Sequence, residues 1–352
     1  MTEDAFVVRD EIIEKMALRA VRLARAARCG TFWAGCAFPG GPSQKDTVER
    51  AAERRRVNRA FGERVERMCP DLVGAADHPD VFFRLFVQTG RVTARVAPLY
   101  VYGRYLKLSR QIPQSRWPCT RHRKHDCPRC GGTGKIYPWS VEEAIADGVA
   151  RQVRFKGTKL HCLGREDVDA RMVGRGRPFV LELVRPLDRC LDAGEAQRWI
   201  NERWGREVQV REMQLVGWRL LNVMNKAKPD KQYLALCECE RPVDAESLAR
   251  LSAMKDVVLD QKTPQRVAHR RADLVRRRVI RRMEAWAADS PQRFMLKLTA
   301  ESGAYVKEFV SSDAGGTRPS VSEFLGAACR VVELDVLDVL WDLPAPPGAA
   351  SA

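Results

Sequence analysis

The stretch from His161 to Phe179 holds the side chains best suited to chemistry. Two carboxylates in it, Asp167 and Asp169, stand among four arginines and three glycines, and an apolar run to Val184 follows. An aspartate in a glycine-flanked turn beside arginines stays ionised at neutral pH, because nearby positive charge favours the charged form. Such a carboxylate suits nucleophilic attack better than proton donation. Spacing alone fits an ion-paired surface loop at least as well.

A second group of residues has the spacing of a metal site. Its members follow the pattern Cys-x2-His-x4-Cys-x2-Cys and are Cys119, His122, Cys127 and Cys130. Two short pairs of this kind can converge on one tetrahedral ion, and the Cys-x2-Cys half is typical of structural zinc. Three glycines after Cys130 supply the tight turns that a zinc knuckle needs. His125 is a rival fourth ligand, and a basic loop with reduced thiols is the alternative to a metal site.

Two basic clusters are candidates for contact with phosphates. The denser one has a single acid, Asp273, among eight arginines: Arg266, Arg270, Arg271, Arg276, Arg277, Arg278, Arg281 and Arg282. Such density favours an anionic partner, although a solvated face is the ordinary alternative. The other cluster interleaves Arg104 and Lys107 with two tyrosines, which is typical of a surface that faces RNA.

Periodicity predicts the elements that must position these residues. Helices are expected over 10–28 and 46–68 and short strands over 82–87 and 92–96, so the first hundred residues read as α+β. From about residue 139 a helix over 193–204 is interspersed with strands, at 179–184, 208–210, 232–236, 294–298 and 332–336. The sequence therefore predicts a mixed α/β fold of the α+β class with a largely antiparallel sheet. The expected divisions are an N-terminal accessory domain 1–97, a basic connector 98–138, a catalytic domain 139–342 and a disordered tail 343–352.

Composition narrows the class of partner. The 352 residues carry 61 Lys and Arg against 45 Asp and Glu, a formal charge of +16, which favours nucleic acid first and a membrane surface second. Eleven cysteines are expected to be thiols or metal ligands rather than disulfides. The acidic start and the lack of an apolar run near ~18 residues predict a cytoplasmic protein without a membrane segment.

Several motifs together resemble a known enzyme family. Gly164-Arg-Glu-Asp167 resembles the Gly-Arg-x-Asp signature of pseudouridine synthases. The closest resemblance is to the archaeal and eukaryotic tRNA pseudouridine synthase family that modifies positions 54 and 55 of the T-loop. Further blocks follow the family's order between roughly residues 98 and 340: Tyr100–Arg110, Lys231–Tyr233, Gln261–Asp273, Tyr305–Phe309 and Pro319–Gly326. A chance match to so many blocks in order is not expected.

The resemblance implies a reaction and roles for particular residues. Uridine is isomerised: the N-glycosidic bond breaks, uracil turns, and C5 rejoins the ribose. Asp167 is implied to attack the flipped nucleotide or to assist a glycal route, with Lys307 paired to it and Tyr233 against the base. The other implied substrate contacts are Arg165, which could fill the space left by the extruded base or grip a phosphate, and the apolar Val306 and Leu334.

It also implies the architecture and the partners. The catalytic domain is expected to have the pseudouridine synthase fold, and the N-terminal domain to be an RNA-binding domain of the THUMP type. The expected partner is the T-arm of tRNA, bound by a monomer with no obligate protein partner. No cofactor is expected for catalysis, and one structural zinc ion is expected at the cysteine cluster. A catalytically silent tRNA-binding protein on the same fold is the alternative, and the choice between positions 54 and 55 stays open.

Overall fold

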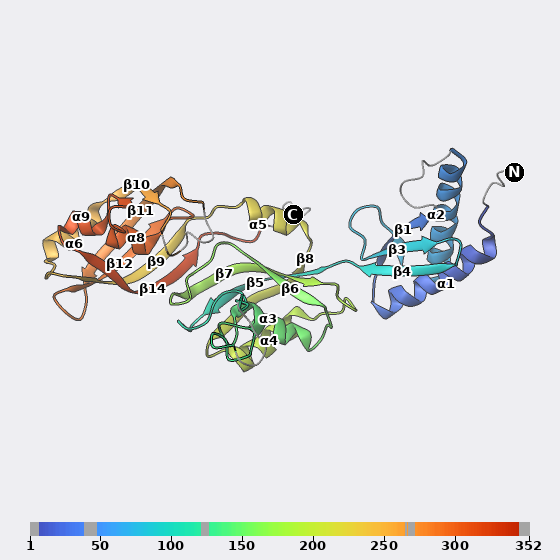
Figure 1. The fold of residues 1–352 in the computed structure, drawn as a ribbon, viewed down its shortest axis with the longest axis horizontal. Helices are drawn as coiled ribbons and strands as arrows, with labels where there is room; N and C mark the ends of the chain where they lie inside the picture. The colour runs from blue at the N-terminus through green and yellow to red at the C-terminus, as the bar shows by residue number, and fades with distance from the viewer. Residues whose placement is uncertain (1–6, 39–47, 121–126, 265, 267–271, 345–352) are drawn as a thin grey trace, which may run out of the picture. The chain divides into compact units, whose positions relative to one another are not determined.

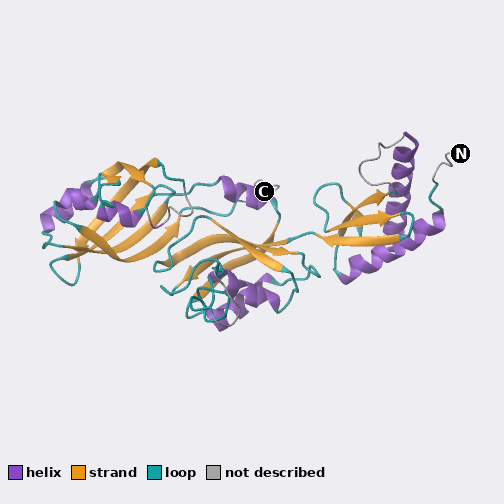
Figure 2. Cartoon of the chain, in the orientation of Figure 1, coloured by secondary structure: helices purple, strands orange, loops and turns teal. Residues whose placement is uncertain are grey.

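The computed structural model describes residues 7–38, 48–120, 127–264, 266 and 272–344 (Figure 1). Its backbone divides into two compact units. The first comprises Met1–Tyr100, Val149–Lys159 and Glu182–Ala196, and the second comprises Val101–Gly148, Leu160–Leu181 and Gln197–Ala352. Helices and strands occur in both units (Figure 2), so the predicted mixed α+β class is confirmed. The tail predicted to be disordered lies, from residue 345 on, outside the described residues.

The first unit packs two helices on a four-stranded sheet of order β2-β1-β3-β4. Its elements are α1 (Asp10–Ala26), β1 (Thr31–Ala37), α2 (Val48–Met68), β2 (Val73–Gly74), β3 (Val81–Phe86) and β4 (Arg91–Val96). The core joins Ile13 of α1 and Phe61 of α2 to Phe32 of β1 and Phe83 of β3. Because side chains alternate across a strand, the neighbours of Phe32 and Phe83 point to the opposite face of the sheet, away from the helices.

A ten-stranded sheet forms the second architecture, in the order β13-β10-β11-β12-β9-β14-β7-β5-β8 with β6 paired to β7. Its strands are β5 (Leu99–Lys107), β6 (Gly157–Cys162), β7 (Arg171–Val184), β8 (Val208–Val216), β9 (Lys231–Cys239), β10 (Lys255–Lys262), β11 (Val275–Ala287), β12 (Arg293–Ala300), β13 (Thr317–Arg318) and β14 (Cys329–Val339). Strands β10, β11, β12, β9 and β14 pair antiparallel in turn, and β14 pairs parallel with β7. The predicted, largely antiparallel sheet is thus confirmed for these strands.

The predicted connector 98–138 needs correction at its start. Leu99–Lys107 is strand β5, which lies between β7 and β8 in the large sheet. Nearly every residue of β5 is buried, so the strand is covered on both faces and shows no alternation of polar and apolar residues. Its tyrosines, arginine and lysine read as a basic surface in the sequence, whereas the fold encloses them.

Short helices complete the fold: α3 (Val141–Ala150), α4 (Ala193–Trp204), α5 (Arg219–Lys226), α6 (Ala245–Ala253), α8 (Val306–Ser311) and α9 (Val321–Leu325). Local sequence fixes two of their starts. The Asp244 carboxylate accepts from the Ser247 amide at 2.6 Å before α6, and Ser320 and Glu323 form a capping box at α9. In the part of the chain that the structure describes, no helix has the length and apolar character that crossing a membrane requires.

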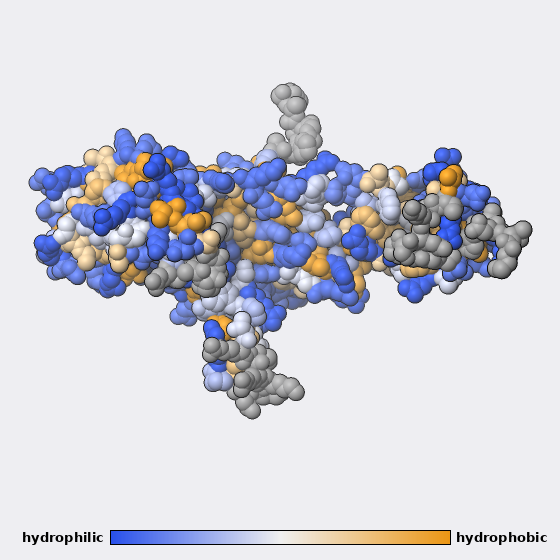
Figure 3. Space-filling view, turned by 45° about the horizontal axis from the view of Figure 1, so that its top comes forward, coloured by the Kyte–Doolittle hydropathy of each residue, from blue (hydrophilic) through white to orange (hydrophobic). Residues whose placement is uncertain are grey.

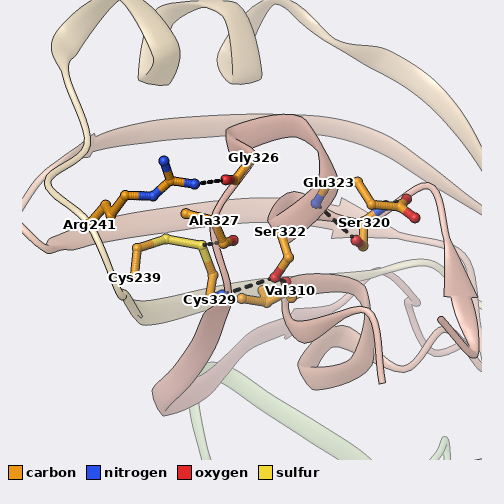
Figure 4. Close-up of a disulfide and its surroundings, with 9 residues drawn as sticks. All are labelled: Cys239, Arg241, Val310, Ser320, Ser322, Glu323, Gly326, Ala327 and Cys329. Carbon is orange, nitrogen blue, oxygen red and sulfur yellow. Dashed lines mark hydrogen bonds between the residues drawn. A yellow bond between two sulfur atoms is a disulfide. The ribbon is translucent and has the colours of Figure 1, made fainter. Parts of the chain in front are cut away.

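Two cysteines form a disulfide that the sequence did not predict. Cys239 at the end of β9 and Cys329 at the start of β14 are directly opposite in the antiparallel register, and their sulfurs are bonded (Figure 4). Beside them, the Cys329 amide donates to Ser322 Oγ at 3.0 Å. The expectation that all the cysteines are thiols or metal ligands is therefore wrong for this pair. Ninety residues separate the two positions, and only the strand pairing brings them together.

Candidate active site

The Gly164–Asp167 motif lies in the loop between β6 and β7, beside the parallel pairing of Arg171 in β7 with Asp335 in β14. Gly164 has a φ of +89°, and a Cβ there would lie 3.0 Å from Arg177 Nη1 and 3.0 Å from Lys231 Cε. Both the backbone angle and the crowding exclude an ordinary side chain. Glycine therefore lets this loop lie directly against two buried cations.

Lys107 of β5 forms hydrogen bonds to the main chain of the Gly164–Asp167 loop from its buried side. Its Nζ is fully buried and donates to the carbonyls of Asp167 at 3.3 Å, Val168 at 2.7 Å, Ser109 at 3.1 Å and Ile112 at 3.1 Å. Burial lowers the pKa of Lys107 to about 8, with the nearby carboxylates opposing the shift. The ammonium thus fixes the main chain of Asp167 itself.

The prediction that Lys107 and Arg104 face RNA is therefore wrong. Arg104 is 2% exposed and donates from Nη1 to the Gly176 carbonyl at 3.0 Å. Its Nη2 donates to the Trp341 carbonyl. Alternating basic and aromatic residues are typical of a nucleic-acid surface only where the face of the strand is exposed, and both faces of β5 are covered.

Glu166, which the sequence analysis passed over, lies in a buried network under the loop. Its carboxylate accepts from Arg177 Nε at 2.9 Å and from the Tyr105 hydroxyl at 2.8 and 2.9 Å. Gln114 Nε2 donates to that hydroxyl at 2.7 Å and to the Gly164 carbonyl at 3.1 Å. Every member is almost fully buried. The residue before Asp167 is thus tied to β5 and β7, which orients the loop.

The carboxylate of Asp167 points the other way and meets two cations. Arg266 Nη1 lies 2.8 and 2.9 Å from its two oxygens, and Arg266 also holds Glu308 of α8 at 2.5 and 3.0 Å. Lys307 Nζ is 3.5 Å from Asp167 and only 2.7 Å from Asp169. The predicted partner of Asp167 is therefore present but is shared, and Arg266 is the nearer cation.

Asp169 is consequently more than a neighbour of the motif. Burial opposes its ionisation, but the hydrogen bond and positive charge of Lys307 outweigh burial and lower the pKa of Asp169. Lys307 is anchored by Asp169 and stays within ion-pair distance of Asp167.

A cavity of about 560 Å³ opens over the loop, within the range of ligand pockets. Its lining includes the side chains for which the family resemblance implies a role in catalysis or substrate contact: Arg165, Asp167, Tyr233, Val306, Lys307 and Leu334. These come from the loop, from β9, from α8 and from β14, which are far apart in the chain. Burial raises the pKa of Tyr233 to about 12, so its phenol is a neutral donor at ordinary pH.

The arginines predicted to contact phosphates do not all lie on one face of the structure. Arg276 and Arg278 line the cavity, whereas Arg277 alternates to the other face of β11, with its side chain 76% exposed and 3.6 Å from Asp260. Arg165 lies with its guanidinium 5.5 Å from the Trp117 ring. Arg270 and Arg271 lie outside the described residues. Hydrophilic residues dominate the face drawn in Figure 3.

The cysteine cluster converges as a metal site requires. The thiols of Cys119, Cys127 and Cys130 are buried and lie within 4.8 Å of one another, with 3.8 Å between the sulfurs of Cys119 and Cys127. A turn closes the knuckle, because the Gly131 amide donates to the Cys127 carbonyl at 2.8 Å. Three sulfur donors at this separation fit a thiophilic ion. The predicted fourth ligand, His122, and its rival His125 lie outside the described residues.

Sequence reasoning missed Arg177, Lys231 and Arg266 as cavity residues, along with Glu166. The sequence could have predicted Lys231 as a cavity residue. Residues two positions apart on a strand share a face, and Lys231 stands two positions before Tyr233. Arg177 stands just before the apolar run Phe179–Val184. An arginine next to a buried strand is expected to have a partner of opposite charge inside the protein. Arg266 was counted among the phosphate contacts, and nothing in its spacing indicated the pairing with Asp167.

Comparison with known proteins places the chain in a family. Residues 100–340 match the family model described as "Pus10, C-terminal". A curated "tRNA pseudouridine synthase Pus10" of Methanothrix thermoacetophila is 38% identical over 340 residues, 94% of this chain and 74% of the relative. The Archaeoglobus fulgidus protein of the same name is 37% identical over 287 residues, 80% of this chain and 79% of the relative.

Solved structures are more distant. One chain of a Cbf5–Nop10–Gar1 complex aligns over 66% of this chain and 47% of its own length, at 13% identity and a TM-score of 0.36. The match over residues 100–340 contains the loop of Asp167 and every side chain named above around its cavity. The chain therefore belongs to the Pus10 family of tRNA pseudouridine synthases.

Proposed function

We propose that this protein isomerises uridine to pseudouridine in the T-loop of tRNA, at position 54, position 55 or both, with Asp167 as the reacting carboxylate. As a member of its family the chain is an isomerase, and tRNA is the substrate that the relatives' name gives. One observation carries the residue assignment. The Asp167 carboxylate shares a single cavity with Tyr233 and Lys307, although the three come from distant parts of the chain.

The arrangement suits both routes considered for this reaction. In one, an Asp167 oxygen bonds to C1′ while the C1′–N1 bond breaks and its electron pair leaves with uracil. In the other, Asp167 accepts the C2′ proton as the same bond breaks, which yields a glycal and the uracil anion. After the base turns, C5 bonds to C1′. On the first route the Asp167–C1′ bond breaks as C5 bonds, and on the second C2′ takes its proton back from Asp167. The C5 proton then leaves to a base and N1 is protonated. Product and substrate have the same atoms, so no cofactor is consumed.

The base must leave its stack to reach the cavity. Tyr233 presents an aromatic face for uracil to stack on, and Val306 and Leu334 add apolar walls. Arg165 at the rim, with Arg276 and Arg278, offers cations for the phosphates or the space that the flipped nucleotide leaves.

Asp167→Asn is the test of this assignment. The variant should lose isomerisation while its tRNA affinity stays within a few-fold of the wild type, because the carboxylate acts on the ribose and binding is spread over many basic residues. The measurement is carbodiimide-dependent mapping of pseudouridine in an unmodified tRNA transcript, with filter binding for affinity. Asp169→Asn removes the carboxylate that anchors Lys307 but not the proposed reacting one, so this variant should retain activity where Asp167→Asn loses it. If Asp169 is essential and Asp167 dispensable, the assignment is reversed; a wild type that binds tRNA but leaves uridine unchanged supports the catalytically silent alternative.

We also propose that the cysteine cluster holds one structural zinc ion, through Cys119, Cys127, Cys130 and His122. The three converging thiols support this, and a fourth protein ligand would leave no open position for an activated water. The ion would stabilise the fold of the knuckle, and the isomerisation described above has no need of a Lewis acid.

The first unit, finally, is proposed to bind RNA on the sheet face opposite its helices. Trp33 is 47% exposed there, and its ring centroid lies 6.3 Å from that of Phe82. Arg95 stacks over Phe82 at 4.5 Å, and Arg84 and Arg91 lie over Phe86 at 5.3 and 5.0 Å. Exposed aromatic rings interleaved with arginines suit stacked bases and their phosphates. We call these six residues the aromatic platform.

A further inference from the structure

Lys231 is a buried cation in the cavity for which the proposed mechanism has no use. It begins β9 two residues before Tyr233, and both side chains lie on the same face of the strand and line the cavity. Lys231 is 5% exposed. Its Cε lies against Gly164, where an added Cβ would be 3.0 Å away and 3.6 Å from Nζ. The ammonium therefore lies next to the loop that presents Asp167.

Its hydrogen bonds leave it incompletely satisfied. Nζ donates to Ser302 Oγ at 3.0 Å and to the Pro229 carbonyl at 3.3 Å, and an ammonium has three N–H groups. Among the described residues, no carboxylate lies within ion-pair distance of Nζ. The other deeply buried cation of the cavity, Arg177, is by contrast paired with Glu166 at 2.9 Å. Keeping an unpaired charge buried costs free energy, and such groups concentrate at functional sites.

We propose that Lys231 Nζ donates a hydrogen bond to a uracil carbonyl and stabilises the negative charge that forms on the base when the glycosidic bond breaks. This role rests on the proposed function. On either route the electron pair of the C1′–N1 bond leaves with the base, where it spreads from N1 onto O2 and O4. A buried cation fixed beside the base stabilises that charge more than it stabilises neutral uracil, which lowers the barrier.

A purely structural role makes a different prediction. Lys231 could serve only to tie Ser302, in the turn between β12 and α8, to the start of β9. In that case the loss of the Ser302 hydroxyl would reproduce the loss of the lysine. If Lys231 acts on the base, the lysine is needed even when that hydrogen bond is absent.

The experiment compares Lys231→Met, Lys231→Arg and Ser302→Ala in single-turnover isomerisation of a tRNA transcript. Lys231→Met should lower the rate constant by about a hundredfold or more, the usual effect of removing one such donor, with tRNA affinity within threefold. Lys231→Arg keeps the charge and should recover part of the rate. Ser302→Ala should stay within about threefold of the wild type. Lys255→Met, an exposed lysine at the start of β10, is the matched control and should change nothing.

The pH profile separates charge from packing. Burial lowers the pKa of Lys231 to about 8, with Arg177 of β7 adding to the shift and Asp230 opposing it. The charged form prevails below this pH, so the wild-type rate should fall as the pH rises through about 8. Lys231→Arg should lose less of its rate there than the wild type, because a guanidinium stays protonated, whereas Lys107, whose pKa burial also lowers to about 8, titrates in both proteins. This comparison does not depend on Lys231→Met being well folded.

Two kinds of outcome are distinguishable. Equal rates for wild type and a folded Lys231→Met, a matching loss in Ser302→Ala, or the same alkaline fall in Lys231→Arg would each overturn the role of Lys231 and leave the proposed function standing. A wild-type enzyme that modifies no T-loop uridine would overturn the proposed function and this role together.

Discussion

At the scale of single residues, the Gly-Arg-Glu-Asp loop has two opposite sides. Asp167 faces the cavity, while its neighbour Glu166 faces the interior and pairs with Arg177. The side chains of that pair are 0% and 1% exposed. Removing one partner leaves the other as an uncompensated charge away from water, which is the costly way to break a buried ion pair.

We therefore expect Glu166→Gln to lower the free energy of unfolding by about 3 kcal/mol. The double variant Glu166→Gln with Arg177→Met should lose less than Glu166→Gln and Arg177→Met do separately, because neither charge is then left alone. Urea denaturation of the four proteins measures this coupling. Glu246→Gln, in an exposed pair with Arg250 at 3.8 Å, is the control and should change stability by less than about 0.5 kcal/mol. Additive losses in the double variant would contradict the pairing.

At the scale of elements, the paired strands β9 and β14 border the cavity at one end and are joined by a disulfide at the other. Tyr233 of β9 is opposite Val336 of β14 beside the cavity, and Cys239 and Cys329 join the same strands at their far ends. The link lies between strands that are already paired, so it acts on stability rather than on chemistry.

Replacing both cysteines by serine should lower the stability of the oxidised protein by about 2–4 kcal/mol, because the crosslink restricts the unfolded chain. Thermal unfolding with and without a reductant tests this. Reductant should lower the melting temperature of the wild type and leave that of Cys239→Ser, Cys329→Ser unchanged. Equal melting of the wild type in both conditions, with the disulfide verified by mass, would count against a stabilising link.

The knuckle at Cys119 is the other element with a separable prediction. Cys127→Ser should lower bound zinc well below the one equivalent expected of the wild type, because only two of the three described sulfur ligands then remain. Elemental analysis of protein purified without added metal measures it, with Cys190→Ser, an exposed cysteine, as the control. Less than about a tenth of an equivalent in well-folded, active wild type would exclude the site. His122→Ala and His125→Ala separate the two rival fourth ligands.

At the scale of the whole molecule, the first unit is expected to add RNA-binding surface to that of the unit in which the chemistry takes place. The cavity lies in the second unit, and the aromatic platform in the first. Trp33→Ala with Phe82→Ala should weaken tRNA binding about tenfold or more, the effect of losing one or two stacked bases, and leave the rate at saturating tRNA unchanged. Filter binding and single-turnover kinetics give the two numbers. Trp286→Ala, an equally exposed tryptophan on β11, is the control; unchanged affinity in the double variant would place the RNA elsewhere.

The sequence by itself determined the family resemblance, the types of several elements and some of the residues that line the cavity. Alternation and helical spacing predicted some of the strands and helices, because those patterns are local, but not α3, β10 or β11. Gly164–Asp167, Tyr233 and Lys307 were recognisable as motifs. Arg104 and Lys107 were mispredicted for the same reason: a basic, aromatic strand looks the same in sequence whether one of its faces is open to solvent or both faces are covered.

Only the tertiary structure decided which groups meet. The order of the strands places Lys107 beneath Asp167, and the register of β9 and β14 places Cys239 opposite Cys329. Because α8 packs close to the loop, Lys307 lies within ion-pair distance of both Asp167 and Asp169. Pairings of this kind join residues tens to hundreds of positions apart, and no local spacing encodes them. Lys231 shows the same limit. Its place beside Tyr233 follows from alternation, but the lack of a carboxylate within ion-pair distance of its Nζ, among the described residues, is a property of the folded cavity alone.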